Sequence, residues 1–297
     1  MTQDSFISVV IPSYNSDKYL DRALKSLNEQ YYKNFEVIII DNHSSDSTCK
    51  IIDEYRSKIK INLFKIKNEG IIAQSRNLGI KKSSGVIISF LDSDDYWHKQ
   101  KLLRINELFY RTKFDVCCHN EIKINEKGIL TDRLNYSIKS KDIYRDLLIF
   151  GNSLSTSAVS IKKEFIIEKN LYFSENKNYN TAEDYDLWLK LALNKAKMLF
   201  IKEYLGFYQF HNSSNSNENI DAHLDNVTNV IMDHLKTVKD EKLSNLVKTR
   251  LQLSKLKLLV KRKDINELLT MIIKFNLLNY KNMSFFIFLK ILKFFQK

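Results

Sequence analysis

Apolar runs alternate with helical patterns over the first hundred residues of the chain. Four runs rich in apolar and β-branched residues predict strands over residues 6–11, 35–40, 61–66 and 86–91. Between them, apolar residues recur at helical spacing and predict helices over residues 17–30, 47–59 and 70–82. Strands separated by helices in this way indicate a parallel α/β sheet with helices on both faces. Pro12 directly follows the first run and is expected to end that strand.

The rest of the chain divides into an irregular part and a helical part. Residues 111–180 mix short strands with polar loops, residues 181–197 predict a helix, and the pattern is helical from about residue 221 to the end. We therefore expect a first domain over residues 1–220, with halves meeting near residue 97. A helical extension is expected over residues 221–297.

Basic residues are concentrated at the end of the chain. Residues 248–297 hold 12 Lys/Arg and 2 Asp/Glu, whereas the preceding 247 residues hold 35 and 33. Such a segment favours an anionic partner. Its lysines accompany large apolar faces instead of a polar groove, which disfavours a nucleic-acid site. Residues 283–297 in particular predict a helix lying on an anionic membrane surface. A core-packing helix with solvated lysines is the alternative.

Cysteine usage and the first residues indicate the compartment. The three cysteines include the adjacent pair Cys117 and Cys118, which cannot build a disulfide framework, and no Cys-x-x-Cys pair suggests zinc. No basic start leads into an apolar stretch, so no secretory signal is expected. We expect a reduced, cytoplasmic setting, with the protein peripheral on the inner face of the cell membrane.

Three polar clusters each follow a predicted strand. They are Ser13 to Asn15, Asp41 to Thr48 and Asp92 to Asp95. Because the carboxyl ends of parallel strands face one crevice, the clusters are expected to form one site. Asp92 and Asp94 stand two residues apart after an extended run, so their carboxylates should lie on the same side of the chain and attract Mg²⁺ or Mn²⁺. A solvated acidic turn is the alternative.

Two further acidic positions have structural as well as functional interpretations. Asp41 suits ribose or ring binding at a strand end, or a turn or helix N-cap. Asp184 forms a capping-box pattern with Thr181, and the pair Glu183 and Asp184 would equally present a carboxylate over the crevice. Neither a G-x-G-x-x-G motif after the first strand nor a P-loop motif occurs, which disfavours dinucleotide and P-loop chemistry.

Five segments, in order along the chain, resemble family 2 glycosyltransferases of the GT-A fold. They are ISVVIPSYNSDKYL, VIIIDNHSSDST, IIAQSRNLGI, ISFLDSDDYW and AEDYDLWLKLA, within residues 5–211. The resemblance implies inverting transfer of a sugar from a UDP-sugar, with Mn²⁺ or Mg²⁺. It also implies a nucleotide-binding half over about residues 1–97 and an acceptor half over residues 98–220.

The resemblance implies roles for individual residues. Positions matching those that bind the nucleotide sugar are Pro12, Tyr14, Asn15, Asp41, Arg76, Asp92 and Ser93. Asp94 and His211 match metal ligands, and Asp184 matches the general base, supported by Glu183. A surface pair of Arg76 with Glu69, and a polar surface role for His211, are the alternatives.

The acceptor is expected to be lipid-linked. Neither the Q-x-x-R-W motif nor the membrane spans of processive relatives are found, so we expect addition of one hexose. The resemblance to bacterial enzymes of the family, together with the expected membrane attachment, implies a polyprenyl-diphosphate-linked saccharide as the acceptor, in O-antigen or capsule assembly. A soluble, protein or teichoic-acid acceptor is an alternative. So is a catalytically silent GT-A binding protein, although the intact Asp92, Asp94 and Asp184 argue against it.

Overall fold

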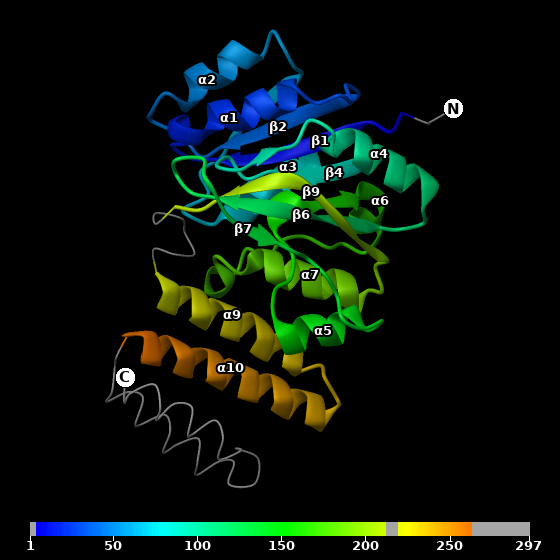
Figure 1. The fold of residues 1–297 in the computed structure, drawn as a ribbon, viewed down its shortest axis with the longest axis vertical. Coiled ribbons are helices and arrows are strands. Elements are labelled where there is room, and N and C mark those ends of the chain that lie inside the picture. The colour runs from blue at the N-terminus through cyan, green and yellow to red at the C-terminus, as the bar shows by residue number, and fades with distance from the viewer. Residues whose placement is uncertain (1–3, 212–218, 263–297) are drawn as a thin grey trace. The chain divides into compact units, whose positions relative to one another are not determined.

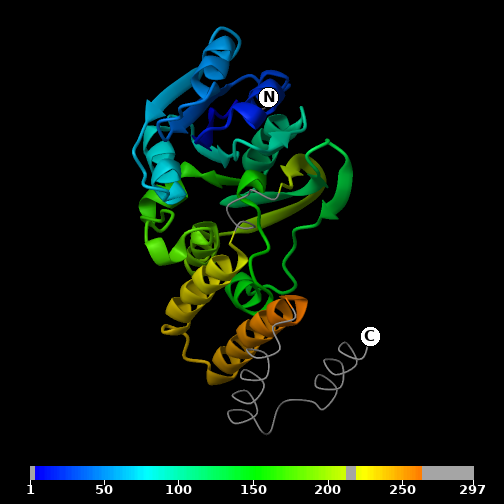
Figure 2. The same ribbon diagram turned by 90° about the vertical axis from the view of Figure 1, so that its left-hand side faces the viewer.

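A computed structural model describes residues 4–211 and 219–262 (Figure 1). The chain divides into two compact units, residues 1–237 and residues 238–297. The first unit is built on one sheet in the order β3-β2-β1-β4-β8-β6-β9-β5, with β7 paired to β6. Helices cover the sheet in the views of Figures 1 and 2.

The first half of the sheet is parallel, as the sequence predicts. Strands β1 to β4 alternate with helices α1 to α3 along the chain. The strands are β1 (Ile7–Ser13), β2 (Phe35–Asp41), β3 (Ile61–Lys65) and β4 (Ile87–Phe90), and the helices are α1 (Asp17–Asn28), α2 (Thr48–Tyr55) and α3 (Ile72–Lys82). The α/β class with parallel strands in this half is thereby confirmed.

Pro12 does not end the first strand, contrary to the prediction. Strand β1 continues to Ser13, and Pro12 is in register with Ile40 of β2. On its other side β1 pairs with β4 only up to Val10. Pro12 therefore lies where β1 has one neighbouring strand, and the missing N–H breaks no ladder bond with β4.

The second half makes the sheet mixed. Strand β8 is antiparallel to both β4 and β6, while β6 and β9 are parallel. The strands are β5 (Tyr96–Trp97), β6 (Val116–Ile124), β7 (Leu130–Leu134), β8 (Val159–Lys162) and β9 (Met198–Gln209). The helices are α4 (Lys101–Arg111), α5 (Ile143–Phe150), α6 (Lys163–Glu168), α7 (Glu183–Leu193) and α9 (Ile220–Leu235), with short 3₁₀ turns η1 (Thr156–Ala158) and η2 (Lys177–Tyr179).

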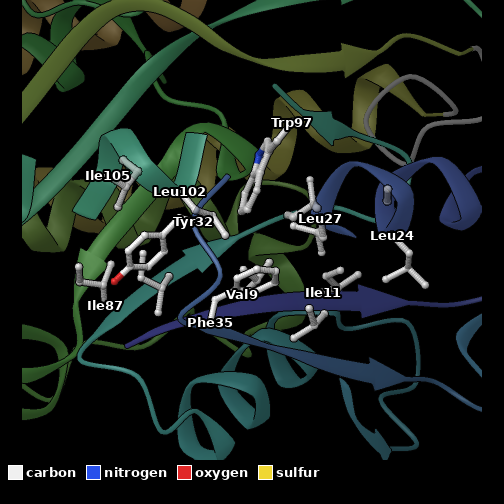
Figure 3. Packing of buried hydrophobic residues seen from close by; sticks show 14 of the residues in the cluster. Val9, Ile11, Leu24, Leu27, Tyr32, Phe35, Ile87, Trp97, Leu102 and Ile105 are labelled. Carbon is white, nitrogen blue, oxygen red and sulfur yellow. The ribbon is translucent and has the colours of Figure 1, made fainter. Parts of the chain in front are cut away.

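The core lies on both faces of β1. Val9 and Ile11 pack with Leu24 and Leu27 of α1 in one apolar cluster (Figure 3). Val10 alternates to the opposite face, where α3 approaches so closely that a Cβ on Gly79 would lie 2.3 Å from Val10 Cγ1. The close approach explains why a glycine suits this helix position, and it places helices on both faces of the strand.

Helix α9 belongs to the first unit. It packs against α7 and η2, so the boundary between the compact units follows residue 237 and not residue 220. In the second unit, α10 (Glu241–Arg262) buries Leu243, Val247 and Leu251, which stand four residues apart on one helix face. No helix among the described residues is long and apolar enough to span a bilayer. Of the basic segment 248–297, residues 263–297 lie outside the described residues.

Candidate active site

Two carboxylates of the acidic turn after β4, Asp92 and Asp94, have different partners. Strand β4 ends at Phe90. Asp92 Oδ1 accepts a hydrogen bond from Arg76 Nη2 at 2.8 Å, while Asp94 Oδ2 lies 2.8 Å from His211 Nε2. Because the strand ends before Asp92, the extended geometry behind the expectation of a shared side does not reach the turn. Both carboxylates are nonetheless held in place by a long-range partner.

Arg76 of α3 joins the acidic turn to the start of α7. Its Nη1 donates to Glu183 Oε1 at 2.5 Å, while its Nη2 donates to Asp92. The guanidinium is 5% exposed and lies over the Phe173 ring, 5.3 Å from its centroid. Burial alone would lower the pKa of Arg76, but the adjacent Asp92 and Glu183 raise it, so the side chain stays charged. The alternative of a surface pair with Glu69 was wrong.

Asp184 lies in the first turn of α7, half-buried and held by the loop that follows α5. Its Oδ2 accepts hydrogen bonds from Asn152 Nδ2 at 3.2 Å and Thr156 Oγ1 at 3.4 Å, and its Oδ1 from the Tyr185 N–H at 2.6 Å. Burial raises the pKa of Asp184, and the positive charge of Arg76 opposes this. The capping-box alternative was wrong: Ala182 is the N-cap, and no side chain caps the helix.

The ends of β1 and β2 meet in one hydrogen-bonded cluster. Asp41 is buried, and its two oxygens accept from the Ser44 N–H at 3.1 Å and the Ser44 hydroxyl at 2.5 Å. The Asn15 N–H donates to Ser44 Oγ at 2.9 Å, and Asn15 Oδ1 accepts from the Ser45 N–H at 2.9 Å. Asp41 therefore has the turn role that the sequence offered.

Serines connect this cluster to the acidic turn. Ser93 Oγ lies 2.9 Å from Ser16 Oγ, and Ser16 Oγ accepts from the Tyr14 N–H at 3.2 Å. The Tyr14 side chain is 61% exposed, so its ring is available to a ligand. Hydrogen bonds thus join the end of β1 to the ends of β2 and β4, as expected for three polar strand ends at one edge.

Four residues to which the sequence assigned no individual role hold the acidic turn in shape. Arg22 Nη2 donates to the Asp94 carbonyl at 3.0 Å and to Gln209 Oε1 at 2.7 Å. Buried Asp95 accepts from the Gln209 N–H at 2.8 Å and from Ser157 Oγ at 2.6 Å. Burial, with Asp94 nearby, raises the pKa of Asp95. Of the four, only Asp95 could have been found from the sequence, since it stands inside the DSDD cluster.

The pair Asp94 and His211 suits a divalent cation. His211 is 7% exposed and stacks on Tyr19, with 5.1 Å between ring centroids, so the surface alternative for His211 was wrong. A carboxylate and an imidazole are ligands that Mn²⁺ accepts. Within residues 4–211 and 219–262, no three His, Cys, Asp or Glu side chains form a metal-binding group. The residues present therefore fit a cation whose remaining ligands are water and substrate phosphates.

Comparison with known proteins decides the family. The model of glycosyl transferase family 2 matches residues 8–166, more than half of the chain. The chain belongs to this family. AmsB of Erwinia amylovora, an amylovoran biosynthesis glycosyltransferase, is 31% identical over 215 residues, covering 69% of this chain and 70% of AmsB.

Other family 2 relatives are longer than this chain. TarS of Staphylococcus aureus, a poly(ribitol-phosphate) β-N-acetylglucosaminyltransferase, is 27% identical over 218 residues, covering 68% of this chain and 35% of TarS. An uncharacterized glycosyltransferase of Rickettsia conorii is 33% identical over 193 residues, covering 64% of this chain and 30% of the relative. The match thus spans about a third of each of these proteins.

Solved structures show the same GT-A fold. TarS 1–349 in complex with UDP-GlcNAc superposes with a TM-score of 0.65 at 23% identity, over 81% of this chain and 70% of that one. A Pyrobaculum calidifontis mannosyltransferase in complex with GDP-Man and Mn²⁺ gives a TM-score of 0.64 at 14% identity, over 95% and 77%. The expected fold class and the assignment as a family 2 glycosyltransferase are confirmed.

Proposed function

We propose that this chain is an inverting, metal-dependent glycosyltransferase that moves one hexose from a UDP-sugar to a saccharide acceptor and forms a β-linkage. The observation that carries the proposal is the Arg76 bridge. One buried guanidinium bonds both Asp92, on the donor side, and Glu183, the neighbour of Asp184. The acidic turn at residues 92–95, which would be the donor loop, and the candidate base are thereby fixed with respect to each other before substrate binds.

Asp184 supplies the base for a single displacement. The acceptor hydroxyl oxygen attacks the anomeric carbon from the face opposite the diphosphate, the bond from that carbon to the diphosphate oxygen breaks, and UDP leaves with the bonding electrons. The acceptor proton passes to Asp184, which later releases it to solvent. Inversion turns an α-linked donor into a β-linked product. Asn152 and Thr156 donate hydrogen bonds to Asp184 Oδ2 and so hold the carboxylate in place.

Asp94 and His211 would hold the divalent cation. When bound, Mn²⁺ or Mg²⁺ neutralises the charge that grows on the leaving diphosphate. Asp92, bonded to Arg76, would face the ribose and phosphates, with Ser93 beside it. Pro12, Tyr14, Asn15 and Asp41 would line the nucleoside side. The UDP-GlcNAc complex of TarS and the Mn²⁺ complex of the mannosyltransferase support this assignment by fold.

We further propose a polyprenyl-diphosphate-linked saccharide as the acceptor, in the assembly of a surface polysaccharide such as O-antigen. The similarity to AmsB, which is named for biosynthesis of amylovoran, supports this class. A polyol-phosphate polymer of the teichoic-acid type is the second candidate, because TarS is named for transfer to poly(ribitol-phosphate). Screening donors against both acceptor types separates the two.

UDP binding tests the donor assignment. Calorimetric titration of UDP should show binding that requires Mn²⁺ and is at least tenfold weaker in Asp94→Ala, because that carboxylate would hold the cation against the diphosphate. Asp132→Ala, on the exposed strand β7, is the matched control and should bind as the wild type does. A folded protein that binds no UDP with or without Mn²⁺ would contradict the UDP-sugar assignment and favour a catalytically silent protein.

Membrane attachment through residues 248–297 is the corresponding proposal for localisation, on the inner face of the cell membrane. The 12 basic residues of that segment support it. Deleting residues 283–297 should reduce sedimentation with phosphatidylglycerol vesicles several-fold, while neutral phosphatidylcholine vesicles bind little of either protein. Equal sedimentation of the deletion and the full chain would rule out an interfacial helix and favour a soluble or protein acceptor.

A further inference from the structure

The segment that leads into α7 is strained. Thr181 has a φ of +68° and stands three residues before Asp184. Among the non-glycine residues at positive φ in the described ranges, Thr181 alone is β-branched. A β-branched residue in the left-handed region persists only where its surroundings hold it. The start of the helix that carries Asp184 therefore depends on contacts from elsewhere in the fold.

Helix α9 supplies those contacts. Three of its side chains, spaced three residues apart and so on one helix face, hydrogen-bond the segment before α7. They are His223 to Thr181 Oγ1 at 2.9 Å, Asn226 to the Asn180 carbonyl at 2.5 Å and Asn229 to the Asn178 carbonyl at 3.3 Å. The turned view shows α9 beside α7 (Figure 2).

The other end of α9 is anchored independently. His234 Nε2 lies 3.1 Å from buried Asp186 Oδ1 of α7, and its Nδ1 lies 3.2 Å from the Tyr144 hydroxyl of α5. Val230 and Ile231 are fully buried. These contacts hold α9 in place without help from residues 223, 226 and 229. Those three side chains therefore bind the segment before α7 from a helix that is already fixed.

We propose that α9 is a positioning element for the candidate base, in which His223 holds strained Thr181 so that α7 begins at Glu183 and presents Asp184 to the acceptor. The inference rests on the proposed function, because it takes Asp184 as the base. It goes beyond that function, since it assigns a role to α9, a helix that the proposed function does not use. His223 acts through Thr181 and touches no reacting atom.

Removing either partner of the His223 contact should loosen the segment. In His223→Ala, amide hydrogen exchange over residues 178–186 should become roughly tenfold faster, with exchange in β1 and β2 unchanged. Thr181→Val removes the same hydrogen bond from the other side and should speed exchange over these residues equally. Exchange in the double variant should be no faster than in either single variant. His223→Asn keeps a polar group able to bond Thr181 and should restore slow exchange. Asp225→Ala, exposed on the same helix, is the control.

The kinetic arm uses the donor and acceptor that the screen identifies. His223→Ala should lower kcat by about 10- to 100-fold, the effect of misplacing a catalytic group by about 1 Å, and leave the Kd for UDP within about twofold. Unchanged exchange over residues 178–186, or faster exchange with normal kcat, would overturn the positioning role. Failure of the wild type to bind UDP would overturn the proposed function instead, while the exchange result would still decide whether α9 holds this segment.

Discussion

Replacing Asp184 by Asn should lower the rate of sugar transfer by about 10³-fold and leave UDP binding unchanged. General-base catalysis contributes about 10²- to 10⁴-fold, and Asn has nearly the same shape but cannot take a proton. The side chain contacts Asn152 and Thr156 on the acceptor side, and Arg76 carries the link to the donor loop, so the donor site should not be affected. Steady-state kinetics together with UDP calorimetry measure both quantities.

The pH dependence of the same reaction gives a second test of the base. Asp184 must be ionised to accept a proton, and burial raises its pKa above the usual carboxyl range. The rate should therefore fall as the pH drops through that raised pKa, at a higher pH than for an exposed aspartate. In Asp184→Asn this acidic limb should disappear from the residual rate.

Two outcomes would count against Asp184 as the base. One is a loss of less than about tenfold in Asp184→Asn, and the other is an unchanged acidic limb in that variant. The matched control is Asp53→Asn, on the exposed side of α2, which should have wild-type kinetics. A variant that lost UDP binding as well would indicate a structural role for Asp184.

The fold of the first half was predictable because its signals are local. Each strand is an apolar run that no helix pattern interrupts, and the first two connecting helices repeat leucine or isoleucine at helical spacing. The exception is Pro12, whose place in β1 depends on where β4 ends. Which strand has a free side at a given residue is a property of the assembled sheet, so the proline alone could not show it.

The candidate site was predictable only in part. Shared placement at strand ends correctly brought Asp41, Asn15 and Ser93 to one edge. It could not show Arg22, which reaches the turn from α1, or Gln209, which is 187 residues away from Arg22 along the chain. The predicted helix start at Thr181 was also too early, because the left-handed turn there depends on α9. Contacts between residues so far apart along the chain leave no pattern in the neighbouring sequence.

Replacing Arg76 by Met should destabilise the protein by about 3–5 kcal/mol, the cost of removing one partner from a buried ion pair. Glu183 would be left buried, with its side chain 6% exposed, and Asp92 would lose its link to α7. Urea unfolding of the variant and the wild type measures the loss. Arg104→Met is the matched control, because that arginine is more exposed and pairs with Glu107 and Glu203; it should cost no more than about 1 kcal/mol.

Two further measurements separate loss of charge pairing from loss of packing. Burial already raises the pKa of Glu183 while Arg76 opposes the rise, so without Arg76 that pKa should rise further. A carboxyl whose pKa is higher in the folded state than in the unfolded state favours folding at low pH, and this contribution is lost as the pH rises through the folded pKa. The deficit of Arg76→Met should therefore be smaller at pH 5 than at pH 8. Adding Glu183→Gln should recover much of the lost stability at pH 8, since no buried charge then remains at that position.

If Arg76→Met cost no more than Arg104→Met, or if its deficit did not change with pH, the bridge would not hold the donor loop to α7. The main support for the proposed function would then be lost.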